Sequence, residues 1–343
     1  MSIPNPDRPE HHRSPAPVQN LPVHDAAAFR VSSGVNQGDP LGIATDLVLE
    51  DIYELDKTAR PRRLALTATD HGEAFTIAPD SEVGQPGARL FLDSLLTFMA
   101  PHGATIEVLV LVETDPEGMI AGTYLHPLSP LAPDTEHALV TIARDGARDR
   151  LAQTACVSFA RGTHITLADG RQIPVEDLRP GDRVLTRDSG PQELRWIGMQ
   201  TLRATGAFAP ITIAPGALNN TGELTLSPNH RLFIYQRTDR LGAGQPEVMV
   251  RAGALVNGVT VVQSEGGFVD YFQLLFDKHE IIYAEGIAAE SLFVDPTTGP
   301  AVPPDIRARL KESARPVSPG RELEPREAPG PDMVELLKHA SAG

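Results

Sequence analysis

From residue 156 to about residue 295, short runs of strand-forming residues alternate with turns. The segments HITLADG, RVLTRDSG and ELTLSPNHRLFIY are examples, and a turn recurs roughly every 8–12 residues. Runs this short leave no room for regular helices, and their β-branched and aromatic residues favour extended backbone. The pattern therefore predicts a compact all-β domain over residues 151–297.

The preceding segment, residues 29–150, also favours strands. RRLALTATD alternates apolar and polar residues, and TIEVLVLVE at 105–113 is typical of a buried strand. By contrast, LFLDSLLTFMAP at 90–101 has apolar residues at helical spacing and stops at a proline, which predicts a helix. The fold class is thus mainly β, with a β-rich N-terminal domain that contains at least one helix.

Both ends of the chain differ from these two segments. Residues 1–28 are rich in Pro, His and Asp, which predicts a disordered tail whose His11, His12 and His24 are solvated rather than metal ligands. Residues 298–343 form a tail rich in Pro and charge. Its last part, residues 332–340, has the pattern of a short helix, expected to be a partner contact or a frayed end.

Composition excludes several classes of function. A net charge of −15 argues against binding to nucleic acid or to an anionic membrane, both of which need clustered Lys and Arg. The N-terminus has no apolar core and is not a secretory signal, and the longest apolar run is about half a membrane span. We therefore expect a soluble protein, cytoplasmic or exported without a cleaved signal.

The chain has a single cysteine, Cys156, at the start of the predicted all-β domain. One cysteine makes no internal disulfide and no Cys-rich zinc site, and we expect no metal or cofactor. A lone cysteine is most often a small buried apolar residue. Its context is nevertheless distinctive, because it is followed by Gly162-Thr163, Asp169-Gly170, Gly181-Asp182, the segment Ser227-Pro-Asn-His230, and FDKHEIIYAEG with Asp277 and His279.

These blocks together resemble the Hint superfamily, which includes hedgehog autoprocessing domains, inteins and bacterial intein-like domains. The similarity runs from Cys156 to near Val294 and is closest to bacterial Hint proteins without an inserted endonuclease. It implies a compact, horseshoe-like all-β fold. It also implies a self-processing protein that cuts its own peptide bond.

In this family the first cysteine attacks the carbonyl of the residue before it, here Ala155, in an N-to-S acyl shift that gives a thioester. A thiol suits this step because it is a strong nucleophile. The leaving amide needs a proton, which the resemblance assigns to His230. Ser227 stands where the family usually has threonine, as a hydrogen-bonding hydroxyl. Thr225, two residues earlier, would point to the same side of a strand as Ser227. It is therefore a second, weaker candidate for that role.

Asp277 and His279 alternate with Lys278 and are therefore expected on one face of a strand. The resemblance implies a second acid–base group in this region, for which His279 is the better match. Many inteins carry an aspartate after the tyrosine of this block, where this chain has Phe272. Asp277 either replaces that aspartate or is a turn residue. His164 occupies a variable position of the family pattern and is not expected to be catalytic.

The fate of the thioester is open at this point. The segment YAEGIAAESLFVDP lacks the His-Asn pair that splicing requires. Attack by water would cleave the chain, whereas an external nucleophile or protein would become joined to residues 1–155. The polar C-terminal tail argues against sterol transfer.

Two other functions compete with self-processing. The Hint fold could be an inactive scaffold attached to a binding or adhesion module. Cys156 and His230 could also form the dyad of a cysteine hydrolase that acts on other molecules. The sequence argues against the hydrolase, because no segment places Cys156 at a helix N-terminus, where a thiol pKa falls.

Overall fold

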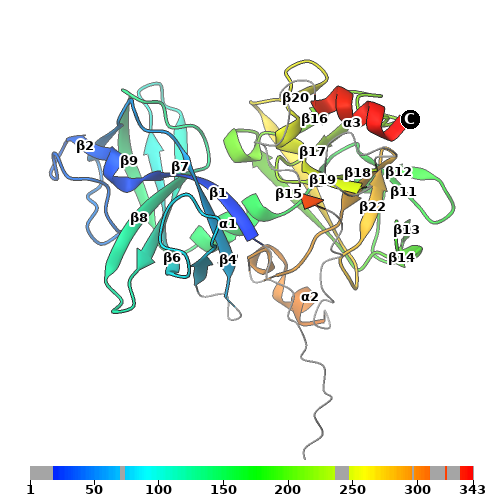
Figure 1. Cartoon of the computed structure of the whole chain (residues 1–343), viewed down its shortest axis with the longest axis horizontal. Helices are drawn as coiled ribbons and strands as arrows, with labels where there is room; N and C mark the ends of the chain where they lie inside the picture. The colour runs from blue at the N-terminus through cyan, green and yellow to red at the C-terminus, as the bar shows by residue number, and fades with distance from the viewer. Residues whose placement is uncertain are drawn as a thin grey trace, which may run out of the picture.

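The computed structural model describes residues 18–69, 74–235, 247–295, 297–309, 321–322 and 333–342. Figure 1 shows two lobes, the first built from the N-terminal half of the chain and the second from the C-terminal half. We call them the first and the second domain. Strands dominate both, which confirms the prediction of a mainly β chain.

The first domain is one nine-stranded antiparallel sheet with the order β2-β3-β9-β6-β5-β4-β1-β8-β7. A further pairing of β6 with β7 closes six of these strands into a ring. Its elements are β1 (Val18–Asp25), η1 (Ala26–Ala28), β2 (Phe29–Ser33), β3 (Ile52–Leu55), β4 (Arg62–Ala68), β5 (Phe75–Ile77), β6 (Arg89–Met99), β7 (Thr105–Thr114), β8 (Ile120–Pro127) and β9 (Glu136–Ala143).

The helix predicted over residues 90–101 is wrong, because this segment is strand β6. It pairs with β7 and β9, and a bulge lies between Leu92 and Ser94. Leu90 therefore packs into one core cluster, whereas Leu96 and Phe98 pack into another. Because the strand has apolar neighbours on both faces and its register shifts at the bulge, its apolar residues do not alternate strictly and mimic helical spacing.

The disordered tail predicted over residues 1–28 is wrong for residues 18–28, and residues 1–17 lie outside the described part. β1 pairs with β4 over six residues and then with β8. Leu21 and Val23 are buried in a core cluster, and His24 is buried as well. Pairing with β4 and β8 therefore keeps β1 in the sheet, although its proline and histidine content is typical of a solvated tail.

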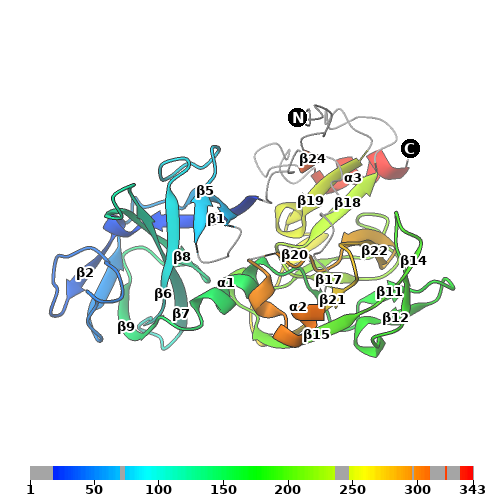
Figure 2. The same ribbon diagram turned by 90° about the horizontal axis from the view of Figure 1, so that it is seen from below.

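A helix that the sequence analysis missed, α1 (Ala147–Ala155), joins the two domains. It begins after Gly146, whose positive φ of 86° suits glycine. The expected boundary between residues 150 and 151 therefore falls inside a helix. Figures 1 and 2 show α1 between the two lobes. Arg150 of α1 forms an ion pair with Glu107 of β7 and lies over the ring of Phe208 in the second domain, 4.4 Å from its centroid.

The second domain contains a six-stranded sheet (β15-β21-β10-β17-β16-β20), a seven-stranded sheet (β12-β11-β22-β23-β18-β19-β24) and the hairpin β13–β14. Its strands are β10 (Phe159–Ala160), β11 (His164–Thr166), β12 (Gln172–Pro174), β13 (Arg183–Leu185), β14 (Pro191–Glu193), β15 (Trp196–Arg203), β16 (Ile211–Ile213), β17 (Leu224–Leu226), β18 (Arg231–Tyr235), β19 (Glu247–Arg251), β20 (Val261–Gln263), β21 (Phe268–Leu275), β22 (Ile281–Ala284), β23 (Ile287–Glu290) and β24 (Arg321–Glu322).

The core of this domain draws on both sheets, with Phe159 and Leu226 from one and Ile282 from the other. The short helical segments are η2 (Val175–Asp177), η3 (Gly206–Phe208), η4 (Ala252–Leu255), η5 (Gly299–Ala301), α2 (Pro304–Arg309) and α3 (Met333–Ala342). α3 is not a frayed end, since Met333, Val334 and Leu337 are buried in this core. In the described part of the chain, no helix has the length and apolar character needed to cross a membrane.

Candidate active site

Cys156 lies at the C-terminal end of α1, where the chain leaves the helix and turns toward β10. Its backbone is extended, with φ −69° and ψ 132°, and its amide N–H still donates to Ala152 O at 2.9 Å. The side chain is buried in a small cluster with Leu275, Leu292 and Val302. The peptide bond between Ala155 and Cys156 is therefore the junction between the helix and the second domain.

The surroundings of Cys156 keep its thiol protonated. Burial raises the pKa of Cys156 to about 12, and the nearby negative charge of Asp295 contributes to the rise. The carboxyl end of a helix also disfavours an anion, in contrast to the helix N-termini that activate cysteine nucleophiles. Attack by Cys156 therefore requires a base that removes the thiol proton during the reaction.

One four-residue turn contacts the backbone on both sides of the Ala155–Cys156 bond. Ser227 Oγ donates to Cys156 O at 3.5 Å and accepts from the backbone N–H of Ser158 at 3.1 Å. Asn229 Nδ2 donates to Thr154 O at 2.8 Å. The turn therefore holds the chain at residues 154, 156 and 158.

The last residue of this turn, His230, is fully buried between two backbone carbonyls. Its Nδ1 lies 3.2 Å from Ser158 O and its Nε2 lies 3.0 Å from Glu290 O. A neutral imidazole carries one N–H, so it can donate to only one of these oxygens at a time. Burial lowers the pKa of His230, although the carboxylate of Glu290 opposes that shift. The ring is thus neutral near pH 7 and able to take up a proton.

The buried carboxylate of Glu290 at the end of β23 links His230 to further charged groups. Glu290 Oε1 accepts from the backbone N–H of Arg231 at 3.1 Å and pairs with Arg231 Nε at 3.2 Å. Glu290 Oε2 lies 3.5 Å from His279 Nε2, longer than a strong hydrogen bond. Burial raises the pKa of Glu290, but Arg231 and His279 outweigh this effect and bring it below its ordinary value. Glu290 is therefore an anion that favours a cationic His230.

A comparison with protein families identifies the second domain. Residues 157–296 match the family model described as "Hint domain". These residues form a Hint domain. The match begins directly after Cys156 and covers both sheets of the second domain apart from β24.

A search of curated proteins gave no match. Among solved structures, the crystal structure of gp41-1 intein matches at 10% sequence identity and a TM-score of 0.25, with 39% of this chain and 97% of that chain covered.

The Hint domain separates the two residues expected on one strand face. Asp277 and His279 lie in the loop between β21 and β22 rather than in a strand, so that prediction is wrong. Asp277 is exposed and pairs with Arg195 Nη2 at 2.8 Å. His279 is buried against the ring of Phe293, and its Nδ1 has no hydrogen-bond partner within the described residues. Only His279 is thus linked to His230, through Glu290.

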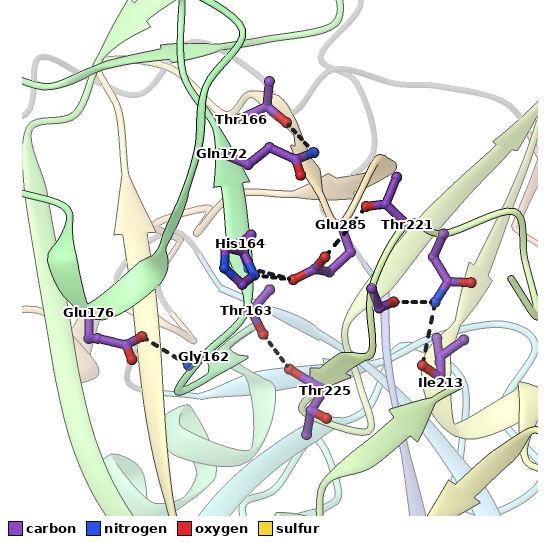
Figure 3. A network of polar contacts seen from close by, with 12 residues as sticks. Gly162, Thr163, His164, Thr166, Gln172, Glu176, Ile213, Thr221, Thr225 and Glu285 are labelled. Atoms are coloured by element: carbon purple, nitrogen blue, oxygen red, sulfur yellow. Dashed lines mark hydrogen bonds and ion pairs between the residues drawn. The ribbon is translucent and has the colours of Figure 1, made fainter. Parts of the chain in front are cut away.

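The other candidate hydroxyl, Thr225, makes its contacts elsewhere in the Hint domain. Its Oγ1 lies 3.2 Å from Thr212 Oγ1, and its carbonyl accepts from Thr163 Oγ1 at 3.1 Å. Figure 3 shows the contact between Thr163 and Thr225. It also shows the hydrogen bond between Nδ1 of His164 and Oε1 of Glu285, which measures 2.8 Å. Thr225 and His164 therefore stabilise the strands around the Gly-Thr turn, whereas Ser227 is the hydroxyl at Cys156.

The sequence analysis missed four residues at this site. Asn229 lies within the Ser227–His230 segment and could have been noted there. Ser158 acts through its backbone, and Asp295 acts through its charge on Cys156. Glu290 contacts a histidine 60 residues away, so only the fold brings the two together. No cluster of three or more metal-ligating side chains occurs among the residues the structure describes.

Proposed function

We propose that the protein cleaves its own Ala155–Cys156 peptide bond through a thioester. One observation carries the proposal: the Ser227–His230 turn contacts the carbonyls of residues 154, 156 and 158, which flank this bond. A turn that served only the domain core would have no need to bind the backbone on both sides of the helix junction. The residues it binds are those whose geometry an acyl shift at Cys156 must control.

The first step is proton transfer combined with nucleophilic attack. His230 takes the thiol proton of Cys156, and the sulfur attacks the carbonyl carbon of Ala155. A C–S bond forms, the C–N bond breaks, and His230 returns the proton to the leaving amide nitrogen. Proton transfer through one histidine removes the need for a free thiolate, which the raised pKa of Cys156 makes scarce.

A local opening of α1 precedes this step. The amide N–H of Cys156 is bonded to Ala152 O, and the ring of His230 faces Ser158 O. The last turn of the helix must therefore release this N–H before His230 reaches the nitrogen. Asn229 and Ser227 hold the carbonyls on either side during the change. Ser227 also supplies the hydroxyl that the Hint resemblance assigns to the reacting peptide.

A second candidate function is an inactive Hint scaffold attached to the first domain. The buried thiol with a pKa of about 12 and the intact helical hydrogen bond at Cys156 favour it. The two functions differ in one outcome, because a scaffold keeps residues 1–155 and 156–343 in one chain. A hydrolase acting on other molecules is disfavoured, since Cys156 is buried in an apolar cluster.

The test is nucleophile-induced cleavage of the purified full chain. Incubation with hydroxylamine, which is small enough for any acceptor site, should yield two fragments on a denaturing gel, residues 1–155 and residues 156–343. Cys156→Ala should stay intact, and Cys156→Ser should react far more slowly because its hydroxyl is a weaker nucleophile. Melting temperatures of both variants verify that the fold is retained. A wild-type chain that stays intact assigns the scaffold role.

A further inference from the structure

A small pocket of about 80 Å³ adjoins the bond that the proposed function cleaves. Ala155 and Val157, the two neighbours of Cys156, form part of its wall. The first residues of β1, including Gln19 and Asn20, form another part. Figures 1 and 2 show the start of β1 reaching from the first lobe to the region between the lobes, close to α1. The pocket is thus shared between the segment to be released and the Hint domain.

The lining of this pocket mixes polar and apolar residues, and its charges balance. Glu290 and Asp295 contribute negative charge, and Arg231 and Arg251 contribute positive charge. Oε1 of Gln19 is buried and, among the described residues, has no hydrogen-bond donor. A buried acceptor without a donor is costly to the fold. Balanced charges favour a neutral molecule over an ammonium ion.

The size of the pocket limits what can enter. Roughly 10–15 Å³ of such space suffices for one water molecule, so the pocket accommodates several. An engineered cavity that admits benzene measures roughly 150 Å³, about twice the space available here. The wall from β1 therefore leaves room for water or a nucleophile of similar size next to Ala155, and too little for an aromatic ring.

We propose that this pocket is the acyl-acceptor site, that it takes water, and that Gln19 and Asn20 of the first domain restrict it to small nucleophiles. The proposal rests on the proposed function, because it needs the thioester at Ala155. Water oxygen attacks the thioester carbon, a C–O bond forms and the C–S bond breaks. Cys156 leaves as a thiol with the proton lost by water, and Ala155 ends as a carboxylic acid.

The pocket gives the first domain a second role. Its C-terminal residue is the acyl donor, and its N-terminal strand selects the acceptor. A nucleophile as large as a protein side chain would have to displace β1, which is paired with β4 and β8. Cleavage by water therefore releases residues 1–155 with a free carboxylate, in preference to joining them to another protein.

The acceptor is tested on the full chain without added thiol. In water enriched in oxygen-18, the fragment 1–155 should carry one heavy oxygen at its C-terminus by mass spectrometry. With equal concentrations of methylamine and benzylamine as free bases, the methylamide of Ala155 should exceed the benzylamide at least tenfold. Comparable amounts of the two adducts, or a fragment without heavy oxygen, overturn the pocket assignment while the thioester stands. No fragment under any condition overturns both proposals.

The role of β1 is tested by Gln19→Ala. This truncation widens the pocket, so it should raise the benzylamide share at least threefold while cleavage by hydroxylamine continues. Gln37→Ala is the matched control, because Gln37 is exposed in a loop of the same domain and binds the carbonyl of Ser32. An unchanged benzylamide share in Gln19→Ala, or an equal rise in Gln37→Ala, would contradict the proposal that β1 restricts the pocket to small nucleophiles.

Discussion

The first domain and the Hint domain each bury a histidine, and the two histidines have different neighbours. His126 in β8 contacts one backbone carbonyl, Pro22 O, at 2.8 Å from its Nδ1. His230 lies between two carbonyls, one of them that of Glu290, whose carboxylate opposes the lowering of its pKa, and it belongs to a turn that binds the chain around Cys156. Burial lowers the pKa of both rings. A shifted pKa therefore does not distinguish His126 from His230, the histidine that we propose to be reactive, whereas their neighbours differ.

The largest expected difference between the two domains is the effect of replacing these histidines. His230→Gln should slow hydroxylamine-induced cleavage by roughly 10²–10⁴-fold, the usual contribution of a general acid–base group. His126→Gln should leave the cleavage rate within a factor of two or so of wild type, as expected of a residue outside the site. Gel densitometry over a time course gives both rates. Equal effects of the two replacements would remove the distinction on which the mechanism rests.

The pH dependence of the cleavage rate should be set by the pKa of His230 and should not depend on the pKa of His126. The reactive form pairs a neutral imidazole with a protonated thiol, and this form dominates from the pKa of His230 up to the pKa of Cys156 at about 12. The rate of the first step should be constant at neutral and mildly alkaline pH. Below the pKa of His230, which burial places under the ordinary value, it should fall about tenfold per pH unit.

Initial rates between about pH 4 and pH 9 measure this profile. The His126→Gln variant should give the same curve, since its ring takes no part in proton transfer. A rate that climbs tenfold per unit through neutral pH would instead indicate attack by a free thiolate, without His230 as a base.

Two serines provide a third comparison. Ser81 in the first domain accepts from Ala65 N at 3.0 Å and donates to Val83 O at 2.7 Å, as Ser227 does at Ser158 and Cys156. Replacement of either by Ala should cost about 1–3 kcal/mol of unfolding free energy. Only Ser227→Ala should slow cleavage, about tenfold for a lost interaction of about 1.4 kcal/mol. Urea denaturation and the cleavage assay separate the two effects, and a slow Ser81→Ala variant would contradict the assignment.

The smallest expected effect concerns Asp295. Its negative charge contributes to the raised pKa of Cys156, and its Oδ1 accepts from the N–H groups of Thr297 and Thr298. Asp295→Asn keeps an acceptor there and removes the charge, so iodoacetamide should alkylate the native chain about two- to fivefold faster. The first domain contains no cysteine, so alkylation reports on the Hint domain alone. An unchanged rate would exclude this electrostatic contribution.

The sequence predicted the Hint domain well because its turns are local. Gly162, Gly170 and Gly181 of the recognised motif all have positive φ, between 85° and 100°, which few other residues adopt. Such turns depend on adjacent residues and are visible in one sequence. Cys156, Ser227 and His230 follow from the same blocks, and the fold places the Ser227–His230 turn on the backbone around Cys156.

The parts that could not be predicted depend on distant contacts. β6 was mistaken for a helix because apolar residues cover both of its faces around a bulge. β1 is held by pairing with β4 and β8, and its own composition resembles a tail. Asp277 and His279 lie in a loop, which the alternation of residue types does not reveal. Glu290 reaches His230 only through the pairing of β18 with β23.

The most direct test of self-processing is the intact mass of the wild-type chain after incubation with hydroxylamine. This nucleophile captures a thioester as a hydroxamate on its acyl carbon. Self-processing should give a fragment of residues 1–155 with a hydroxamate on Ala155, together with residues 156–343 carrying a free amino group on Cys156. An uncut wild-type chain, or the same fragments from Cys156→Ala, would contradict it.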